Sequence, residues 1–386
     1  MPPAKSQKSR HFWRKSCRRG VGSAILAPTA LTFSRVTAGT LVATSPSVKI
    51  AFFDTHHFER GPFALANQRF GHEISFFEPR LTAETAPLAR GHGAVCSFVS
   101  DKLDARTLEL LRDGGTRLIA LRSAGYNHVD LAAAARLGLP VVRVPEYSPY
   151  AVAEHAVALV LALNRKIHRA HARVREGNFS LEGLVGFDLH GKTVGIVGTG
   201  KIGQVAARIF AGFGCRVIAY DVAPNEAFAA ETGVRYCELE QLYREADVLS
   251  LHVPLTPTTR HMVDARAFDA MKRGAMIVNT GRGALIDSRA LIAALKSGHL
   301  GAAGLDVYEE EEGVFFHDLS DLVLQDDVLA RLLTFPNVLV TSHQAFLTTE
   351  ALGSIAEVTL ENVRAFERGE PLANEVHAQA MLAVLR

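Results

Sequence analysis

The sequence predicts an α/β protein built on doubly wound parallel sheets, and three observations lead to this fold class. Short apolar runs alternate with stretches of helical periodicity in two parts of the chain, residues 48–147 and 191–341. A glycine-rich turn, Gly198–Gly203, stands between one such run and the helical stretch that follows it. The 386 residues are 48% apolar and 21% charged, which is typical of a globular chain with room for two domains.

The first part of the alternation extends to about residue 147. Its apolar runs predict strands at Val48–Asp54, Gly93–Phe98, Leu118–Leu121 and Val141–Val144. A helical pattern then continues from Ala151 to Arg175, and we expect one long helix there that bridges two domains.

The second part, from Gly191 onward, is regular enough to predict a parallel sheet. Its strands are expected at Val194–Val197, Val217–Tyr220, Val248–Val253, Met276–Asn279, Ala302–Val307 and Val338–Thr341. Thr348–Arg368 has the pattern of a final helix, which Glu370-Pro371 would end.

The glycine turn has the complete context of a dinucleotide-binding unit. A strand precedes it, a helix follows it, and the next strand ends on Asp221, eighteen residues past Gly203. Gly198 permits the tight turn, Gly200 lets the backbone approach a pyrophosphate, and Gly203 lets the helix lie close to the strand. The free N–H groups of the helix would hold the phosphates, and Asp221 would accept hydrogen bonds from the adenosine ribose. The chain is therefore expected to bind a nicotinamide dinucleotide.

In a parallel sheet, ligands bind outside the carboxyl ends of the strands, so residues just past each strand are candidates for chemistry. Arg282, the acids Glu309–Glu312 and His343 all occupy such positions. Reduction of a ketone by hydride needs a cation for the substrate carboxylate, an acid for the oxygen, and a partner that keeps the acid charged. Taken alone, however, His343 could be structural, the acids could be a solvated face, and spacing cannot choose among the four.

No metal site is expected. His168 and His171 lie one helical turn apart but lack a third ligand. The four cysteines are widely spaced without a CxxC pair, which favours a reduced, cytoplasmic compartment.

Charge is distributed unevenly along the chain. Nine of the 42 lysines and arginines lie in the first 53 residues, which hold no acidic residue, so the rest is mildly acidic and argues against nucleic acid as a partner. Residues 1–47 are expected to form a basic, disordered extension. Arg18-Arg19 before an apolar stretch loosely resembles a twin-arginine signal, and the composition also suits an organelle transit peptide, but we favour a dispensable extension. Pro28 and the short apolar run argue against a membrane span.

From about Val48 to Val376 the chain resembles the D-isomer-specific 2-hydroxyacid dehydrogenases, most closely the NAD-dependent fermentative D-lactate dehydrogenases. The resemblance is carried by the segments Leu121–Asp130, Val144–Pro149, Ala153–His155, Gly198–Gly203, Pro254–Pro257, Val278–Asp287, Gly304–Tyr308 and His343–Phe346. It implies two Rossmann-like domains with an active-site cleft between them. A substrate domain would comprise residues 48–147 completed by 347–386, and an NAD-binding domain residues 148–346.

The resemblance also implies roles for individual residues. Arg282 would bind the substrate, Glu311 would be the catalytic acid 29 positions later, and His343 would donate the proton. The residues implied at the cofactor are Gly198, Gly200, Lys201, Ile202, Gly203, Asp221, Val253, Pro254, Thr259, Thr280, Gly281, Arg282 and Asp306. Those implied at the substrate are Phe98, Ala124, Gly125, Tyr147, Arg282 and Phe346. The three aromatic rings would leave room for a methyl group, so pyruvate and D-lactate are the expected substrate pair.

Two other members of the superfamily fit less well. Formate dehydrogenase resembles this site with glutamine in place of the acid, so Glu311 counts against it, and phosphoglycerate dehydrogenase usually carries a regulatory domain after its last helix, which is not expected here. A dehydrogenase for another 2-keto acid and a dinucleotide-sensing corepressor of the same fold stay open. Because relatives pair through their cofactor domains, we also expect a homodimer, with its interface centred on Ala153–Lys166.

Overall fold

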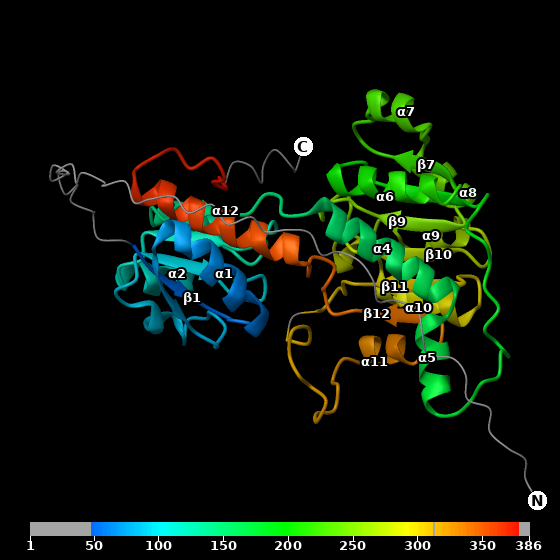
Figure 1. The fold of residues 1–386 in the computed structure, drawn as a ribbon, viewed down its shortest axis with the longest axis horizontal. Helices are drawn as coiled ribbons and strands as arrows, with labels where there is room; N and C mark the ends of the chain where they lie inside the picture. The colour runs from blue at the N-terminus through cyan, green and yellow to red at the C-terminus, as the bar shows by residue number, and fades with distance from the viewer. Residues whose placement is uncertain (1–47, 312, 378–386) are drawn as a thin grey trace, which may run out of the picture. The chain divides into compact units, whose positions relative to one another are not determined.

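The computed structural model describes residues 48–311 and 313–377, and these form two α/β domains, each built on a parallel sheet (Figure 1). This confirms the predicted fold class. The extension at residues 1–47, with Arg18-Arg19 and Cys17, lies outside the described residues. Within the described ranges, no helix is both long and apolar enough to cross a membrane, and no group of three or more potential ligand side chains could hold a metal ion.

The first domain has five strands in the order β2-β1-β3-β4-β5. The strands are β1 (Lys49–Phe52), β2 (Glu73–Phe76), β3 (Ala94–Ser97), β4 (Leu118–Leu121) and β5 (Val141–Val142), and all paired neighbours are parallel. Its helical segments along the chain are α1 (His57–Phe70), η1 (Ala86–Ala89), α2 (Ala105–Asp113) and α3 (Leu131–Arg136). Strands β3, β4 and β5 are buried along their whole length, as expected where a sheet is covered on both faces, whereas the edge strand β2 is partly exposed.

The last helix of the chain packs on this first domain. Helix α12 (Thr349–Glu367) lies against α1, and its Ile355 and Leu360 join the cluster that contains Phe52. The segment after α12 continues along the same domain, where Glu375 bridges β5 and Val376 enters the core on the other face of the sheet.

The second domain has seven strands in the order β12-β11-β10-β9-β6-β7-β8. They are β6 (Thr193–Val197), β7 (Arg216–Tyr220), β8 (Arg235–Tyr236), β9 (Val248–Leu251), β10 (Met276–Asn279), β11 (Ala302–Leu305) and β12 (Val338–Val340). Its helical segments are α4 (Pro149–Asn164), α5 (Ile167–Arg175), α6 (Lys201–Gly212), α7 (Glu226–Thr232), α8 (Leu239–Glu245), α9 (Ala265–Ala270), η2 (Gly283–Leu285), α10 (Ser288–Lys296) and α11 (Asp327–Leu333). The direction of winding reverses between β6 and β9, and the glycine turn follows β6 at this point. Such a switch point is where open α/β sheets bind ligands.

The single long helix predicted over Ala151–Arg175 is wrong, because the chain breaks after Asn164. Lys166 adopts a left-handed conformation with φ of 51°, and α5 starts in a new direction. The side-chain amide of Asn164 is buried; its NH₂ donates to the Phe187 carbonyl at 2.7 Å, and its oxygen accepts from the Phe187 N–H at 2.8 Å. It therefore binds the segment of chain that passes this helix end 23 residues later. A tertiary contact thus ends the helix where the local periodicity would continue it.

Six of the predicted strands end one or two residues earlier than expected, and two of these ends bear on the site. β9 stops at Leu251, so His252 lies just beyond the strand, although its N–H still donates to the Val197 carbonyl at 2.7 Å. β11 stops at Leu305, which places Asp306 at the carboxyl edge of the sheet.

Candidate active site

The centre of the site is a contact between His343 and Glu311. Nδ1 of His343 lies 2.9 Å from Oε1 of Glu311, and the backbone N–H of Tyr308 donates to the other carboxylate oxygen at 3.2 Å. His343 has a φ of 54°, a strained conformation for a residue with a side chain and one that is concentrated at functional sites. Because Glu311 occupies Nδ1, Nε2 is the ring nitrogen left to exchange a proton with a ligand.

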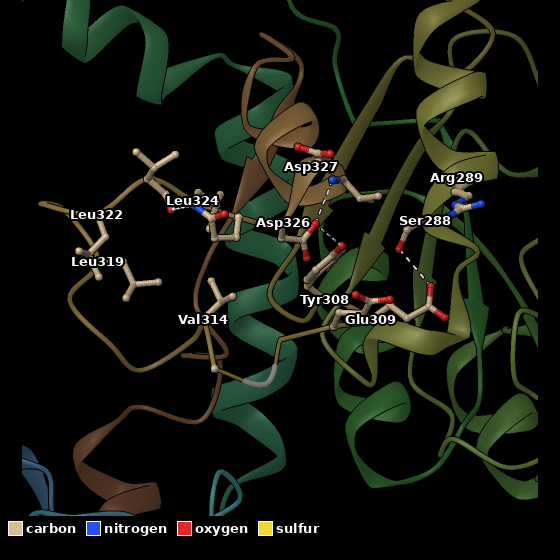
Figure 2. Close-up of a pocket in the computed structure, with 15 residues that line it drawn as sticks. Ser288, Arg289, Tyr308, Glu309, Val314, Leu319, Leu322, Leu324, Asp326 and Asp327 are labelled. Carbon is tan, nitrogen blue, oxygen red and sulfur yellow. Dashed lines mark hydrogen bonds between the residues drawn. The ribbon is translucent and has the colours of Figure 1, made fainter.

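The neighbouring acids are directed elsewhere, which resolves the choice that spacing left open. Glu309 accepts from Ser288 at 3.3 Å and contacts His261 at 2.6 Å and Arg260 at 3.0 Å. Figure 2 shows Glu309 beside Ser288 at a cavity of about 640 Å³, which Glu310 also lines; Glu309 additionally lines a cavity shared by Arg282 and His343 but has no hydrogen bond to either of them. Leucines of the segment before α11 cover another side of the cavity in Figure 2. Among the described members of the acidic run, Glu311 is therefore the one that contacts His343.

Arg282 lies on the same side of the sheet, directly after β10. Its carbonyl accepts from the Asn279 amide at 2.8 Å, and its own Nη1 donates to the Gly281 carbonyl at 2.8 Å. The guanidinium passes so close to Gly125 of the first domain that a Cβ there would overlap Nη2. Arg282 and His343 line the same two cavities, of about 400 and 670 Å³, so the cation and the acid–base pair share one space.

Asp306 organises the loop that carries His343. Its side chain is fully buried, accepts from the backbone N–H groups of Gln344 and Ala345 at 2.9 Å each, and accepts from the Thr341 hydroxyl at 2.5 Å. His155 of α4 lies 3.3 Å away. Burial favours the neutral acid, but the hydrogen bonds from His155, Thr341 and Ala345 outweigh it and hold the pKa of Asp306 below its usual value.

The three predicted aromatic residues gather at the smaller cavity. The ring of Phe346 lies 6.5 Å from that of Phe98 and 6.3 Å from that of Tyr147, measured between centroids. Burial raises the pKa of the Tyr147 phenol, so this side of the cavity is poorly hydrated. Ala124 and Gly125 line the same cavity beside Arg282.

The glycine turn has the geometry that a pyrophosphate needs. Gly198 has a φ of 91°, and a Cβ at Gly203 would overlap the Gly198 carbonyl, so the fold itself requires both glycines. Gly200, by contrast, has no protein atom within 4 Å of an added Cβ, and it begins α6 without a side-chain cap. The open space at Gly200 and the uncapped helix N-terminus fit a dinucleotide phosphate. Thr280 adds a buried hydroxyl for which the described residues provide no hydrogen-bond partner.

The other predicted cofactor residues fall into two groups. Ile202, Val253, Pro254, Thr280, Gly281 and Asp306 line the 400 Å³ cavity. Lys201 instead pairs with Glu146, and Asp221 accepts from the backbone and hydroxyl of Thr199 at 2.6 and 3.0 Å. Thr259 turns its hydroxyl to the Pro254 carbonyl at 2.7 Å and lines neither cavity shared by Arg282 and His343.

Several residues that line the site were not among the sequence predictions, and Arg122 and Phe316 are two of them. Arg122 is fully buried, pairs with Glu59 at 2.6 Å, and places its guanidinium 4.6 Å from the ring centroid of Phe98. A charged residue directly after the apolar run Leu118–Leu121 was a signal that could have found it. Phe316 contacts His343 and lines both cavities, but no local pattern marks it.

The chain is similar in sequence and in structure to known dehydrogenases. Residues 157–345 match the family model for the NAD-binding domain of D-isomer-specific 2-hydroxyacid dehydrogenases. The chain is 52% identical to the D-lactate dehydrogenase of Escherichia coli over 329 residues, 85% of this chain and 100% of that relative. The solved structure of the pyruvate reductase of Chlamydomonas reinhardtii is similar with a TM-score of 0.82, at 46% identity over 85% of this chain and 98% of that one. D-lactate dehydrogenase from Lactobacillus jensenii, solved with NAD⁺, is similar with a TM-score of 0.72, at 34% identity over 85% of this chain and 99% of that one.

Proposed function

Because the chain belongs to the D-isomer-specific 2-hydroxyacid dehydrogenase family, whose members are NAD-dependent oxidoreductases, we propose that it reversibly reduces pyruvate to D-lactate. The observation that carries this proposal is the shared cavity in which Arg282 and the His343–Glu311 pair face a small aromatic pocket. The name of the E. coli relative and that of the Chlamydomonas pyruvate reductase agree with this substrate.

Each charged residue has one task in this reaction. The Arg282 guanidinium binds the pyruvate carboxylate, because its planar fork matches two carboxylate oxygens. NADH, held at the glycine turn Gly198–Gly203, would supply the hydride for C2 of pyruvate. Nε2 of His343 protonates the carbonyl oxygen as negative charge develops on it, and Glu311 at Nδ1 stabilises the imidazolium and orients the ring. In lactate oxidation the same nitrogen accepts the hydroxyl proton.

The two domains would divide the binding work. The segment from residue 148 to 346 would hold the dinucleotide, with its pyrophosphate at Gly200 and the N-terminus of α6 and with a ribose at Asp221. A carboxylate at Asp221 also disfavours the 2′-phosphate of NADPH through charge repulsion. Residues 48–147, on whose sheet residues 347–377 pack, would provide Gly125 and two of the aromatic walls of the substrate pocket.

The size of the pocket supports pyruvate over longer 2-keto acids. Phe98, Tyr147 and Phe346 surround a cavity of about 400 Å³ that the nicotinamide must also enter. A longer side chain would gain only about 0.8 kcal/mol for each methylene that it buried, which is small beside the strain of overpacking such a pocket. We therefore expect 2-ketobutyrate to react more slowly than pyruvate, and branched 2-keto acids to react poorly.

The decisive experiment follows NADH absorbance with pyruvate and analyses the chirality of the product. The wild-type protein should produce D-lactate, and His343→Ala and Arg282→Ala should each lower kcat/KM by about 10²-fold or more. His171→Ala, at an exposed histidine of α5, is the matched control and should retain full activity. Cofactor binding without turnover would support a dinucleotide sensor instead, and L-lactate as product would contradict the proposal.

A further inference from the structure

We propose that Phe316 is a specificity-determining residue that closes the substrate pocket from the side of the NAD-binding domain. The proposal rests on the proposed reduction of a short 2-keto acid and identifies which side chain limits its length. Phe316 lies on the segment between Glu311 and α11, whereas the aromatic wall of Phe98 and Tyr147 belongs to the first domain.

The ring of Phe316 contacts groups from both domains. Its centroid lies 5.1 Å from that of Phe98 in an edge-to-face arrangement, 6.0 Å from that of His56, and 5.9 Å from that of His343. Edge-to-face pairs at this separation are favourable beyond the area that they bury. Phe316 thus connects the proton-donating histidine with the apolar wall across the cleft.

The backbone around Phe316 is arranged to turn the ring toward the cleft. Phe316 has a φ of 68°, a left-handed conformation that is unfavourable for an L-residue. Its neighbour Phe315 is buried in the core of the second domain, and the N–H groups of Val314 and Phe315 donate to the Glu311 carbonyl at 3.1 and 3.0 Å. The buried ring of Phe315 fixes the turn against the core of the second domain. Because the next residue, Phe316, is left-handed, its ring is directed away from that core and toward the cavity. Strain of this kind persists where surrounding structure enforces it, as it does at binding sites.

The partner of Phe316 is itself held rigidly. The Phe98 N–H donates to Asp101 at 2.7 Å, and the Arg122 guanidinium lies over the Phe98 ring. Arg122 is fixed in turn by its ion pair with Glu59. Phe316 therefore meets a preorganised surface, and the space that the two rings leave between them is defined by rigid groups.

Phe316 lines both cavities that contain the catalytic residues. On one side is the apolar cavity of about 400 Å³, and on the other a cavity of about 670 Å³ lined by Arg80, Lys102 and Asp104, among others. Removal of the ring would join the two spaces next to His343. A branched keto acid could then extend its side chain into the opened volume while its carboxylate stays on Arg282.

The test compares kcat/KM for 2-ketoisocaproate and for pyruvate in the wild-type protein, Phe316→Leu and Phe316→Ala. We expect the ratio of 2-ketoisocaproate to pyruvate to rise at least tenfold in Phe316→Ala, with a smaller rise in Phe316→Leu. Leu322→Ala is the matched control, since Leu322 lies on the same segment with 68% of its surface exposed, and it should leave the ratio unchanged. NADH binding, followed by fluorescence, should be the same in all four proteins.

The outcomes separate this proposal from the proposed function. If the wild-type protein fails to reduce pyruvate, the proposed function is wrong. If it reduces pyruvate but Phe316→Ala keeps the wild-type ratio, Phe316 does not determine specificity. If Phe316→Ala binds NADH yet loses activity with both acids equally, the residue positions His343 and the specificity proposal is likewise overturned.

Discussion

Gly125 and Arg282 meet so closely that the glycine limits where the guanidinium can lie. A Cβ at Gly125 would overlap Nη2, which is the end of a flexible side chain and can move aside. We expect Gly125→Ala to lower kcat/KM for pyruvate by about 10²-fold, because a displacement of about 1 Å at a catalytic group has this effect. The free energy of unfolding should change by no more than about 0.5 kcal/mol.

Gly353→Ala is the control for this prediction. An added Cβ at Gly353 has no neighbour within 4 Å, and the residue lies inside α12. It should stabilise the protein by about 0.5–1 kcal/mol in urea unfolding and leave kcat/KM unchanged. A Gly125→Ala protein with wild-type activity would contradict the closeness of Arg282 to the first domain.

At the residue scale, the sequence predicted those site residues that lie together at the carboxyl edge of a single sheet. Arg282, Asp306 and His343 each follow a strand of the second domain, so the topology alone predicts that they lie near one another. The choice of Glu311 over Glu309 depends on a turn that starts at Glu311 and on the bonds of Glu309 to Ser288 and His261. These are tertiary contacts, which spacing does not encode; the resemblance to a family supplied the choice in advance.

At the scale of elements, Asp306 links the end of β11 to the loop after β12. We expect Asp306→Asn to destabilise the protein by about 1–3 kcal/mol, because the new NH₂ group must face a backbone N–H of Gln344 or Ala345 and leave it without an acceptor. His343 sits on that loop, so kcat should fall together with stability. Urea unfolding and NADH assays on the same preparation measure both effects.

Asp269→Asn makes the same chemical change at an exposed position of α9 and serves as the control. It should alter neither quantity. Full stability of Asp306→Asn would show that the Asp306 carboxylate does not hold the loop.

The elements themselves were predicted best where burial is uniform. β10 lies at its predicted bounds, Met276–Asn279, because all four residues are buried between layers of helices. The break between α4 and α5 was missed, since it depends on a bond from Asn164 to Phe187, 23 residues away. The helical pattern of the local sequence contains no information about a hydrogen-bond partner so far along the chain.

At the scale of the molecule, apolar side chains of Ala153–Lys166, the segment expected to centre a dimer interface, are already covered. Ala153, Ala156, Val157, Val160 and Leu163 of α4 lie in the core of their own chain. The exposed apolar side chains instead follow that helix: Ile167, Val174, Phe179, Leu181 and Val185, each with at least half of its surface exposed. A cluster of this kind is typical of a surface that another protein covers.

We therefore expect a homodimer that is centred on residues 167–187 and no longer on Ala153–Lys166. Light scattering at micromolar concentration should give the mass of a dimer for the wild-type protein. A variant with Phe179→Ser, Leu181→Ser and Val185→Ser should be a monomer, since these three side chains are 74–83% exposed and serve no core within the chain. A monomeric wild-type protein would contradict the prediction.

Long-range contacts explain why the whole site could not be read from local pattern. Phe316 and Phe98 come from different domains, yet their rings are 5.1 Å apart. Arg122 and Glu59 form a buried pair that joins β4 to α1. Periodicity predicts the layers of each sheet, but only the assembled layers determine which side chains meet across them.

The stability of the whole molecule should depend on pH through two partly buried histidines. Burial lowers the pKa of His252 to about 4, and burial, with the charges of Arg122 and Arg282, lowers that of His128 to about 4. An unfolded histidine has a pKa of about 6.5, so between pH 6.5 and 4 the unfolded chain binds more protons than the native one. Stability is therefore complete above about pH 6.5 and falls as the pH decreases through this window, by at most about 3 kcal/mol for each histidine.

Asp101 opposes this trend over part of the range. Burial raises its pKa to about 6, so the native state binds the extra proton between pH 6 and 4 and gains stability there as the pH falls.

The contribution of one histidine must therefore be isolated by substitution. Urea unfolding of the wild-type protein and His252→Gln at pH 7 and pH 5 does this, because glutamine can still bond the Ser250 hydroxyl, which lies 2.9 Å from Nε2 of His252, and does not titrate. The loss of unfolding free energy between the two pH values should be smaller in His252→Gln, whereas His57→Gln, at an exposed position outside the predicted dimer interface, should match the wild-type protein. An equal loss in the wild-type protein and His252→Gln would mean that His252 titrates as freely in the native state as in the unfolded chain.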